Sequence, residues 1–290
     1  MGSEGQEVRL AGIQTACSAE SSRNTEKALE FARIAIEKGA QIICFQELFN
    51  THWFPREMKK EHFALAETLE GPTLKKMRQI AADHKVVLVC PFFEAGEGQR
   101  FYNSAVVVDI DGTISGCYRK VHVPQIPLWE ERYYFSAGDR GFPVFPTQHG
   151  ILGVQICWDN FFPEGSRILA LKGAQIIFAP TAAAFASQKR WETVIMGNAI
   201  TNGCYIFRVN RVGSEEKQDF YGMSFCVSPE GELLGQPTGM KEGIALIDVD
   251  LKQIDQVRKE WSFLKDRRPE AYREITETGW PSAENRPDSF

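Results

Sequence analysis

Hydrophobic and polar residues alternate in some stretches of the chain and recur at helical spacing in others, which predicts a mixture of strands and helices. The stretch VRLAGIQTA, residues 8–16, alternates apolar and polar positions, as is typical of a β-strand. Residues 24–38 place apolar side chains every three or four positions, and Gly39 is expected to end that helix. The apolar run AQIICFQEL, residues 40–48, predicts a buried strand. The chain therefore opens with a strand–helix–strand unit.

The same alternation continues along the chain, but hairpins interrupt it. Further helices are expected at 72–84, 163–172 and 189–202, and further strands at 85–95, 150–157, 174–182 and 204–213. Two hairpins are expected at 102–120, turning at Asp111-Gly112, and at 220–235, turning at Pro229-Glu230-Gly231. Because hairpins add antiparallel strands, we predict mixed sheets in a single α/β domain. That domain is expected to cover residues 1–266. Residues 267–290, rich in Pro, Glu and Arg, are expected to form an arm on the surface or on a partner subunit.

Composition and charge exclude several classes of function. Hydrophobic residues make up 43% and charged residues 24% of the chain, as in ordinary soluble globular proteins. The net charge of −5 gives no electrostatic footprint for nucleic acid, so no nucleic-acid partner is expected. The N-terminus lacks the pattern of a signal peptide, and the apolar runs are too short to span a bilayer, so no membrane partner is expected.

The seven cysteines are spread along the chain without the close pairs of a zinc knuckle or a redox motif. A chain of 290 residues without a secretory signal is not expected to depend on disulfides. Reduced thiols and a cytoplasmic location are therefore the expectation.

Three predicted strands end in chemically useful side chains. Glu47 closes the strand IICFQEL, Lys120 closes ISGCYRK, and Cys157 closes ILGVQIC. In α/β folds, strand ends and helix N-termini commonly build the site. A carboxylate can take a thiol proton and return it to a leaving amine, while an ammonium stabilises an oxyanion. A helix N-terminus after Cys157 is also expected to lower the pKa of its thiol.

Each of these residues has a simpler interpretation when taken alone. A cysteine in an apolar strand is usually buried and inert. Taken alone, Cys157 fits either that role or a catalytic one. Glu47 could pair with a surface lysine, and Lys120 could be solvated. Together the three gain weight, because three separate strands deliver them at the same kind of position.

The segments FQELF, YRKVHVP and ICWDNFFPE resemble the three signatures of the nitrilase superfamily of carbon–nitrogen hydrolases. The resemblance extends over nearly the whole chain, from LAGIQTA to FYGMSF. CWDNFFPE and EERYYFSAGD are most similar to the N-carbamoylputrescine amidohydrolase-like branch. The resemblance implies a four-layer αββα sandwich, no metal or organic cofactor, and self-association into a dimer or larger homo-oligomer.

The resemblance also implies roles for individual residues. Cys157 matches the nucleophile, Glu47 the general base and Lys120 the lysine that stabilises the oxyanion. Trp158 follows the nucleophile, so its backbone N–H is expected to donate to the oxyanion.

A second glutamate of the family precedes the Tyr-Tyr-Phe stretch, and Glu131 takes that place, with Glu130 as the alternate register. His122 raises the competing hypothesis of a Cys–His dyad. We favour packing or hydrogen bonding for His122, because the family pattern places the catalytic cation at Lys120.

The substrate tail is constrained less strongly by the sequence. Residues 159–162, just after the cysteine, contain no cation to clamp a carboxylate, which favours a neutral or cationic tail. Glu192 is a candidate partner for an amine, with core packing as the alternative. Asp159 and Glu164 are expected to be structural, near the start of the helix. Candidate walls of the site, again with core packing as the alternative, are Phe54, Trp129, Trp158 and Trp191.

The leading hypothesis is an amidohydrolase that cleaves a small linear N-carbamoyl amine or amide through a covalent cysteine intermediate and releases ammonia. An aliphatic amidase, an omega-amidase or a nitrilase is the alternative. A non-catalytic binding protein on the same fold is a third hypothesis. The four catalytic matches count against it.

Overall fold

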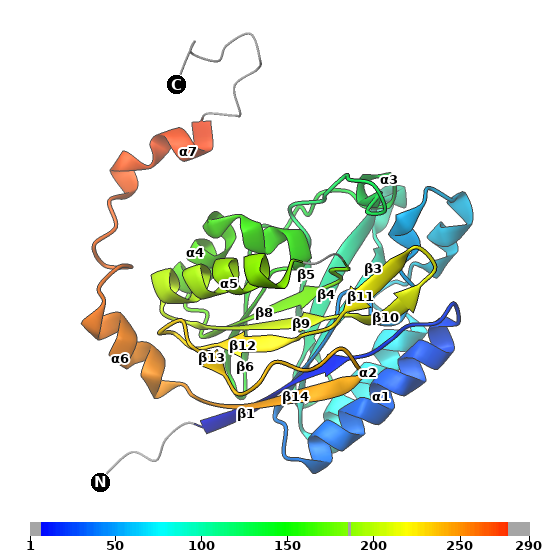
Figure 1. Ribbon diagram of the computed structural model, residues 1–290, viewed down its shortest axis with the longest axis horizontal. Helices are drawn as coiled ribbons and strands as arrows, with labels where there is room; N and C mark the ends of the chain where they lie inside the picture. The colour runs from blue at the N-terminus through cyan, green and yellow to red at the C-terminus, as the bar shows by residue number, and fades with distance from the viewer. Residues whose placement is uncertain (1–6, 185–186, 278–290) are drawn as a thin grey trace.

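The computed structural model describes residues 7–184 and 187–277. Two six-stranded sheets pack face to face, and helices cover the outer face of each (Figure 1). This is the four-layer αββα arrangement that the resemblance to the nitrilase superfamily implies. Among the described residues, no helix is long and apolar enough to cross a membrane.

The first sheet has the strand order β14-β1-β2-β3-β4-β5. β1, β2 and β3 run parallel, whereas β14, β4 and β5 pair antiparallel with their neighbours, so the sheet is mixed as predicted. Its elements are β1 (Glu7–Gln14), α1 (Ser21–Glu37), β2 (Ile42–Phe45), α2 (Pro72–His84), β3 (Val87–Ala95), β4 (Phe101–Val108), β5 (Ile114–Arg119) and β14 (Gly243–Asp250).

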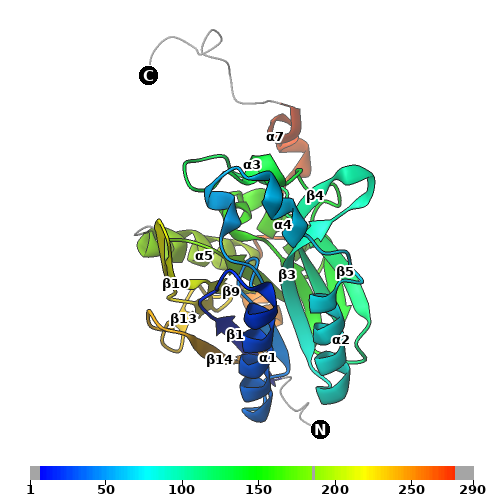
Figure 2. The ribbon, with the colours of Figure 1, turned by 90° about the vertical axis from the view of Figure 1, so that its right-hand side faces the viewer.

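The second sheet repeats this plan with the order β13-β12-β9-β8-β7-β6. β7, β8 and β9 are the parallel strands, and α4 and α5 lie on the outer face (Figures 1 and 2). Its elements are β6 (Val144–Thr147), β7 (Gly150–Val154), α4 (Pro163–Leu171), β8 (Ile176–Thr181), α5 (Gln188–Asn202), β9 (Tyr205–Asn210), β12 (Phe225–Val227) and β13 (Leu233–Leu234).

The main core lies between the two sheets. Along β1, Leu10 faces the second sheet, while Ala11 and Ile13 face the helices, as the period of a strand requires. Gly12 lies where the two sheets come closest. A Cβ there would meet the side chains of Phe207 at 2.8 Å and Val209 at 2.9 Å, so only glycine fits.

One predicted hairpin is wrong in its first half. The hairpin expected over 220–235 begins only at β12, which pairs with β13. Phe220 and Tyr221 instead belong to β11 (Gln218–Tyr221), which pairs with β10 (Val212–Glu215) in a separate two-stranded sheet. The physical reason is a break between the strands, because Gly222 and Met223 both have left-handed backbones, with φ of 67° and 58°.

The chain leaves the sandwich after α6 (Lys252–Glu260). Residues 261–277, including the short helix α7 (Arg273–Glu277), extend away from the sheets (Figures 1 and 2). Trp261 and Ile275 are each 61% exposed there. The part of the predicted arm from 278 to 290 lies outside the described residues.

Candidate active site

The three candidate catalytic residues converge from both sheets. Glu47 lies two residues beyond β2, Lys120 directly follows β5, and Cys157 lies three residues beyond β7. The side chains of Glu47 and Lys120 are fully buried, and Cys157 is only 5% exposed. The carboxyl ends of strands therefore meet here as the sequence predicts.

A buried cluster of charges surrounds Lys120. Its Nζ donates to Glu47 Oε1 at 2.8 Å and to Glu131 Oε2 at 2.7 Å. Asn103 Nδ2 donates to the same Glu47 oxygen at 2.8 Å. Burial is the largest single effect and lowers the pKa of Lys120, but the attraction of Glu131, Glu47 and Cys157 and the hydrogen bond to Glu131 together outweigh it, so its pKa is raised above the ordinary value. The lysine therefore stays protonated.

The second glutamate of the cluster is Glu131 and not Glu130. Glu131 is the first residue of the short helix α3 (Glu131–Tyr134) and is fully buried against Lys120. Glu130 is half-buried and accepts a hydrogen bond from Gln125 instead. Burial and the Glu47 carboxylate raise the pKa of Glu131 to about 7, against the opposing effect of Lys120.

One carboxylate oxygen of Glu47 has no hydrogen-bond partner among the described residues. Oε1 accepts from both Lys120 and Asn103, whereas Oε2 is buried and has no hydrogen-bond partner among the described residues. A buried acceptor without a partner is costly unless something else satisfies it. Glu131 Oε1 is likewise buried without a partner among the described residues, so these two carboxylate oxygens are free to accept a proton from a neighbouring group.

Cys157 sits on a strained turn. Its φ is 48°, in the left-handed region that non-glycine residues seldom adopt, and it begins the 3-10 helix Cys157–Phe161. Asn160 Nδ2 holds the turn by donating to Cys157 O at 2.9 Å and to Gln155 O at 3.1 Å. Trp158 comes next, and the first N–H groups of a helical turn lack acceptors within it.

Asp159 fixes the same turn to the first sheet. Its carboxylate accepts from Tyr118 Oη at 2.6 Å, from the Ile156 N–H at 3.0 Å and from the His122 N–H at 2.9 Å. The His122 ring also hydrogen-bonds Asp159, through Nδ1 at 2.9 Å, and stacks on Phe162 with centroids 3.7 Å apart. Asp159 is therefore structural, and His122 packs and hydrogen-bonds, as the sequence analysis favours.

The pKa of the Cys157 thiol differs from the expectation. Burial and the nearby Glu47 carboxylate raise it well above its ordinary value, and the Lys120 ammonium only partly opposes them. The predicted lowering by a helix N-terminus is wrong because the desolvation of a buried thiolate is the larger effect. The thiol is protonated at neutral pH and needs a base to react.

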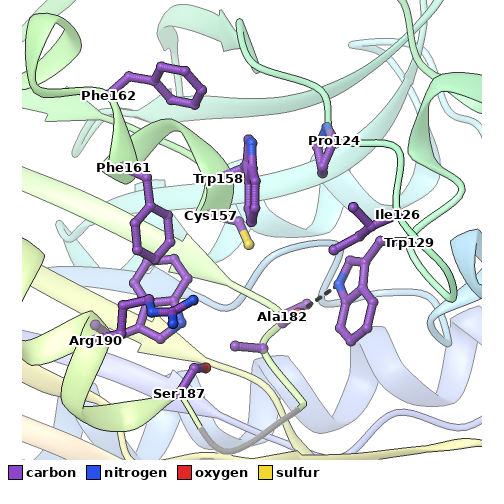
Figure 3. Close-up of a pocket in the computed structure, with 12 residues that line it drawn as sticks. Pro124, Ile126, Trp129, Cys157, Trp158, Phe161, Phe162, Ala182, Ser187 and Arg190 are labelled. Carbon is purple, nitrogen blue, oxygen red and sulfur yellow. Dashed lines mark hydrogen bonds between the residues drawn. The ribbon is translucent and has the colours of Figure 1, made fainter. Parts of the chain in front are cut away.

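A mainly aromatic pocket of about 240 Å³ opens over the Cys157 sulfur (Figure 3). Three predicted wall residues, Trp129, Trp158 and Trp191, line it. Trp129 is fixed by a hydrogen bond from its Nε1 to Ala182 O at 3.2 Å. Arg190 also lines the pocket, although no pattern in the sequence predicts this.

Two predicted substrate contacts lie outside the pocket lining. Phe54 packs in an aromatic cluster, with ring centroids 4.9 Å from those of Phe93 and Tyr134. Glu192 accepts a hydrogen bond from Gln188 Nε2 at 3.1 Å. For these two, the alternative of a structural role fits the described contacts better.

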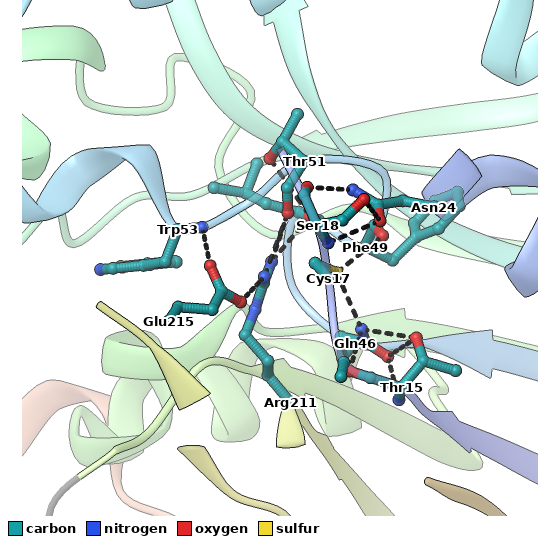
Figure 4. A network of polar contacts seen from close by, with 12 residues as sticks. Thr15, Cys17, Ser18, Asn24, Gln46, Phe49, Thr51, Trp53, Arg211 and Glu215 are labelled. Atoms are coloured by element: carbon teal, nitrogen blue, oxygen red, sulfur yellow. Dashed lines mark hydrogen bonds and ion pairs between the residues drawn. The ribbon is translucent and has the colours of Figure 1, made fainter. Parts of the chain in front are cut away.

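Sequence reasoning missed the residues that hold Glu47 in place. Arg211, which Figure 4 shows beside Glu215, is fully buried on the chain after β9. It donates from Nη2 to Glu47 O at 3.1 Å and to Leu48 O at 2.8 Å. Its Nη1 pairs with Glu215 at 2.6 Å. The signal was present in RVNR, because arginines within an apolar strand need partners. The role of Asn103 gave no comparable signal.

Comparison with known proteins identifies the class to which this fold and site belong. The model of the carbon–nitrogen hydrolase family matches residues 8–259. The chain belongs to that family and is an enzyme of the kind that cleaves C–N bonds other than peptide bonds.

Individual relatives share most of their length with this chain. The N-carbamoylputrescine amidase of Solanum lycopersicum is 38% identical over 282 residues, covering 92% of this chain and 94% of that protein. The citrullinase of Francisella tularensis is 34% identical, covering 92% and 98%. Among solved structures, a carbon–nitrogen hydrolase from Helicobacter pylori G27 aligns with a TM-score of 0.89 at 33% identity, covering 93% and 98%.

Proposed function

We propose that this enzyme hydrolyses a C–N bond of a small linear N-carbamoyl amine or amide through a covalent intermediate on Cys157, with release of ammonia. The observation that carries the proposal is the unpartnered Glu47 Oε2 in a buried charge cluster. The charges of this cluster influence the Cys157 thiol, which faces the pocket. The similarity to an N-carbamoylputrescine amidase and to a citrullinase supports a ureido head group.

The first step forms the bond to sulfur. Glu47 Oε2 takes the thiol proton as the Cys157 sulfur attacks the carbonyl carbon. The carbonyl oxygen becomes an oxyanion, stabilised by the Lys120 ammonium and the backbone N–H of Trp158. Because Lys120 stays protonated between two carboxylates, its charge is in place before the reaction begins.

The second step breaks the C–N bond. The oxyanion collapses, and Glu47 returns its proton to the departing nitrogen. A ureido substrate then loses its amine and leaves an S-carbamoyl enzyme, whereas an amide loses ammonia and leaves an S-acyl enzyme. Glu131 keeps Lys120 oriented during this step through their 2.7 Å contact.

Water completes the cycle. Glu47 accepts a proton from the attacking water, the C–S bond breaks, and the proton returns to sulfur. An S-acyl enzyme yields a carboxylic acid. An S-carbamoyl enzyme yields carbamate, which decomposes to carbon dioxide and ammonia.

Mass spectrometry of the intact protein during turnover tests the proposal. Wild type, Cys157→Ala and the control Cys17→Ser would each be mixed with a ureido compound, an amide and a nitrile, while ammonia is measured. We expect an adduct and ammonia in wild type and Cys17→Ser, and neither in Cys157→Ala. The adduct mass separates carbamoyl from acyl transfer, so an acyl adduct alone would favour the amidase alternative. Turnover that persists in Cys157→Ala would refute the mechanism.

We further propose that the described part of the C-terminal arm, residues 267–277, packs on a second copy of the chain in the cytoplasm. Trp261 and Ile275 are exposed on the segment that leaves the sandwich, and Leu171 is exposed on α4. Apolar side chains on an extended segment are typical of a surface that a partner covers. All seven cysteines are free thiols, which suits a reducing compartment. Light scattering on the full chain and on a chain ending at Glu260 tests this, with a smaller assembly expected for the shorter chain.

A further inference from the structure

One end of the pocket carries a positive charge that the catalytic steps do not use. Arg190, near the start of α5, is the one charged side chain among the described residues that line the pocket. Figure 3 shows its guanidinium on the same wall as Phe161 and Ser187. Among the described residues, no carboxylate lies within ion-pair distance of it. Its charge is therefore available to a ligand.

A second arginine lies directly behind this wall. Arg208, on β9, is fully buried, and its guanidinium stacks 4.6 Å from the ring of Trp191, which lines the pocket. It donates to Tyr221 Oη at 3.0 Å and to Gln188 Oε1 at 3.2 Å, both neutral groups. Its Nε is buried without a hydrogen-bond partner among the described residues. A buried cation is normally paired with a carboxylate, and this one is not.

The nearest acid balances only part of this charge. Glu192 accepts from Gln188, and Gln188 in turn accepts from Arg208, so one carboxylate acts indirectly on the buried arginine. With two cations and one anion in this group, the wall of the pocket keeps a net positive charge. The excess lies at Arg190, where the pocket is open to solvent.

We propose that Arg190 binds an anionic group, a carboxylate, at the far end of the substrate. This rests on the proposed function, in which the ureido or amide head lies at Cys157. Guanidinium is suited to binding a carboxylate with two parallel hydrogen bonds. Ser187 lines the same wall, and its Oγ lies 3.4 Å from Tyr221 Oη. Because Tyr221 Oη accepts a hydrogen bond from Arg208, Tyr221 links this wall to the buried arginine.

The same wall argues against the neutral or cationic tail that the sequence favoured. The residues after the cysteine contain no cation, but α5 supplies one from a different part of the chain. An amine would meet Arg190 without a carboxylate in the described lining to offset the repulsion. The aromatic side chains between the two ends suit a short chain of methylene groups.

A matched pair of substrates tests this inference. A ureido acid and a ureido amine of equal chain length would be compared with wild type, Arg190→Gln, Arg190→Glu and Lys189→Glu. Lys189 is the adjacent exposed cation on α5 and does not line the pocket, so it controls for net charge. We expect wild type to prefer the acid by at least about tenfold in kcat/KM. Arg190→Gln should raise KM for the acid about 10-fold or more with little change in kcat.

The charge-reversed variants decide between local binding and general attraction. Arg190→Glu should invert the preference towards the amine, whereas Lys189→Glu should shift both substrates by less than about twofold. A wild-type preference for the amine, or equal effects of the two reversals, would overturn the inference.

Binding to Cys157→Ala separates this inference from the proposed function. Calorimetric titration of that variant with the two ureido compounds needs no turnover. Tighter binding of the acid that is lost on adding Arg190→Gln would support the carboxylate site even if wild type hydrolysed neither compound. Equal binding of acid and amine would overturn it even if wild type hydrolysed both.

Discussion

The two ends of the pocket hold their charges in opposite ways. At the catalytic end, Glu47, Lys120 and Glu131 are fully buried, and Lys120 Nζ contacts Glu47 at 2.8 Å and Glu131 at 2.7 Å. At the far end, Arg190 and Arg208 have no carboxylate in contact among the described residues. In the first group the cation is held by two carboxyl groups, whereas in the second neither cation contacts one in the described part of the chain.

This difference separates chemistry from substrate choice. A cation already held by carboxyl groups suits a neutral amide or ureido head and is ready to stabilise charge as it develops. A cation without a partner suits a charged substrate group. Substitutions at the catalytic end should therefore change kcat and the free energy of unfolding, and substitutions at the far end should change KM and substrate preference.

The largest effect is expected from Lys120→Met. Removing the cation leaves two buried carboxylates facing each other, which should lower the free energy of unfolding by about 3–5 kcal/mol. The lost oxyanion stabilisation should lower kcat by at least about 100-fold. Lys76→Met is the control, because Lys76 pairs with Glu26 on the surface and should cost at most about 1 kcal/mol. Denaturant unfolding and steady-state rates measure both effects. Equal losses of unfolding free energy in Lys120→Met and Lys76→Met would contradict the expected difference between the buried and the exposed ion pairs.

The neighbouring glutamates offer a matched pair of variants. Glu131→Gln should lower kcat about 10- to 100-fold, because the amide supports the Lys120 ammonium less well than a carboxylate does. Glu130→Gln should stay within about twofold of wild type, since Glu130 contacts Gln125 outside the cluster. Rates measured side by side check this. A larger loss in Glu130→Gln would assign the role to the alternate register.

The secondary-structure elements and the meeting of three strand ends could be predicted because local patterns carry them, whereas the four-layer arrangement and the place of Glu131 were implied by the family resemblance. The helix Pro72–His84 has the bounds that its apolar spacing and Pro72 predict. Glu47, Lys120 and Cys157 were predicted to meet because strand ends gather at one edge in α/β folds. The hairpin at 220–235 was misjudged, because two left-handed residues ended a strand inside an apolar run.

The far end could not be predicted, because its residues come together only in three dimensions. Arg190 lies in the polar stretch SQKR and reads as a solvated helix residue, yet it lines the pocket. Arg208 lies on β9, and its guanidinium stacks on Trp191, which lines the pocket. Phe54 is of a residue type that is common in pocket walls, but it packs on Phe93. Aromatic residues carry no local signal that separates core from wall.

A moderate effect is expected from Arg211→Lys, which acts at the catalytic end through the backbone. Arg211 donates to the carbonyls of Glu47 and Leu48, and lysine cannot reproduce its fork of donors. A displaced Glu47 should lower kcat about tenfold with KM nearly unchanged. Arg78→Lys, at an exposed pair with Glu70, is the control. A change in KM alone would show that Arg211 does not act through Glu47.

The last effect concerns stability alone and is the pH dependence that Glu131 imposes on it. Its pKa is raised from 4.5 in the unfolded chain to about 7 in the folded protein. Between these values the folded protein keeps a proton that the unfolded chain has released, so the free energy of unfolding falls as pH rises. The contribution is fully present below pH 4.5 and is lost as pH passes about 7.

Glu131→Gln removes this titration without removing the others. The free energy of unfolding of wild type minus that of the variant should therefore decrease steadily from about pH 5 to about pH 7 and become constant above that. Denaturant unfolding of both proteins across this range measures it. A difference that stays constant with pH would mean that Glu131 is ionised throughout. The catalytic end would then carry one more negative charge than positive, mirroring the excess cation at Arg190.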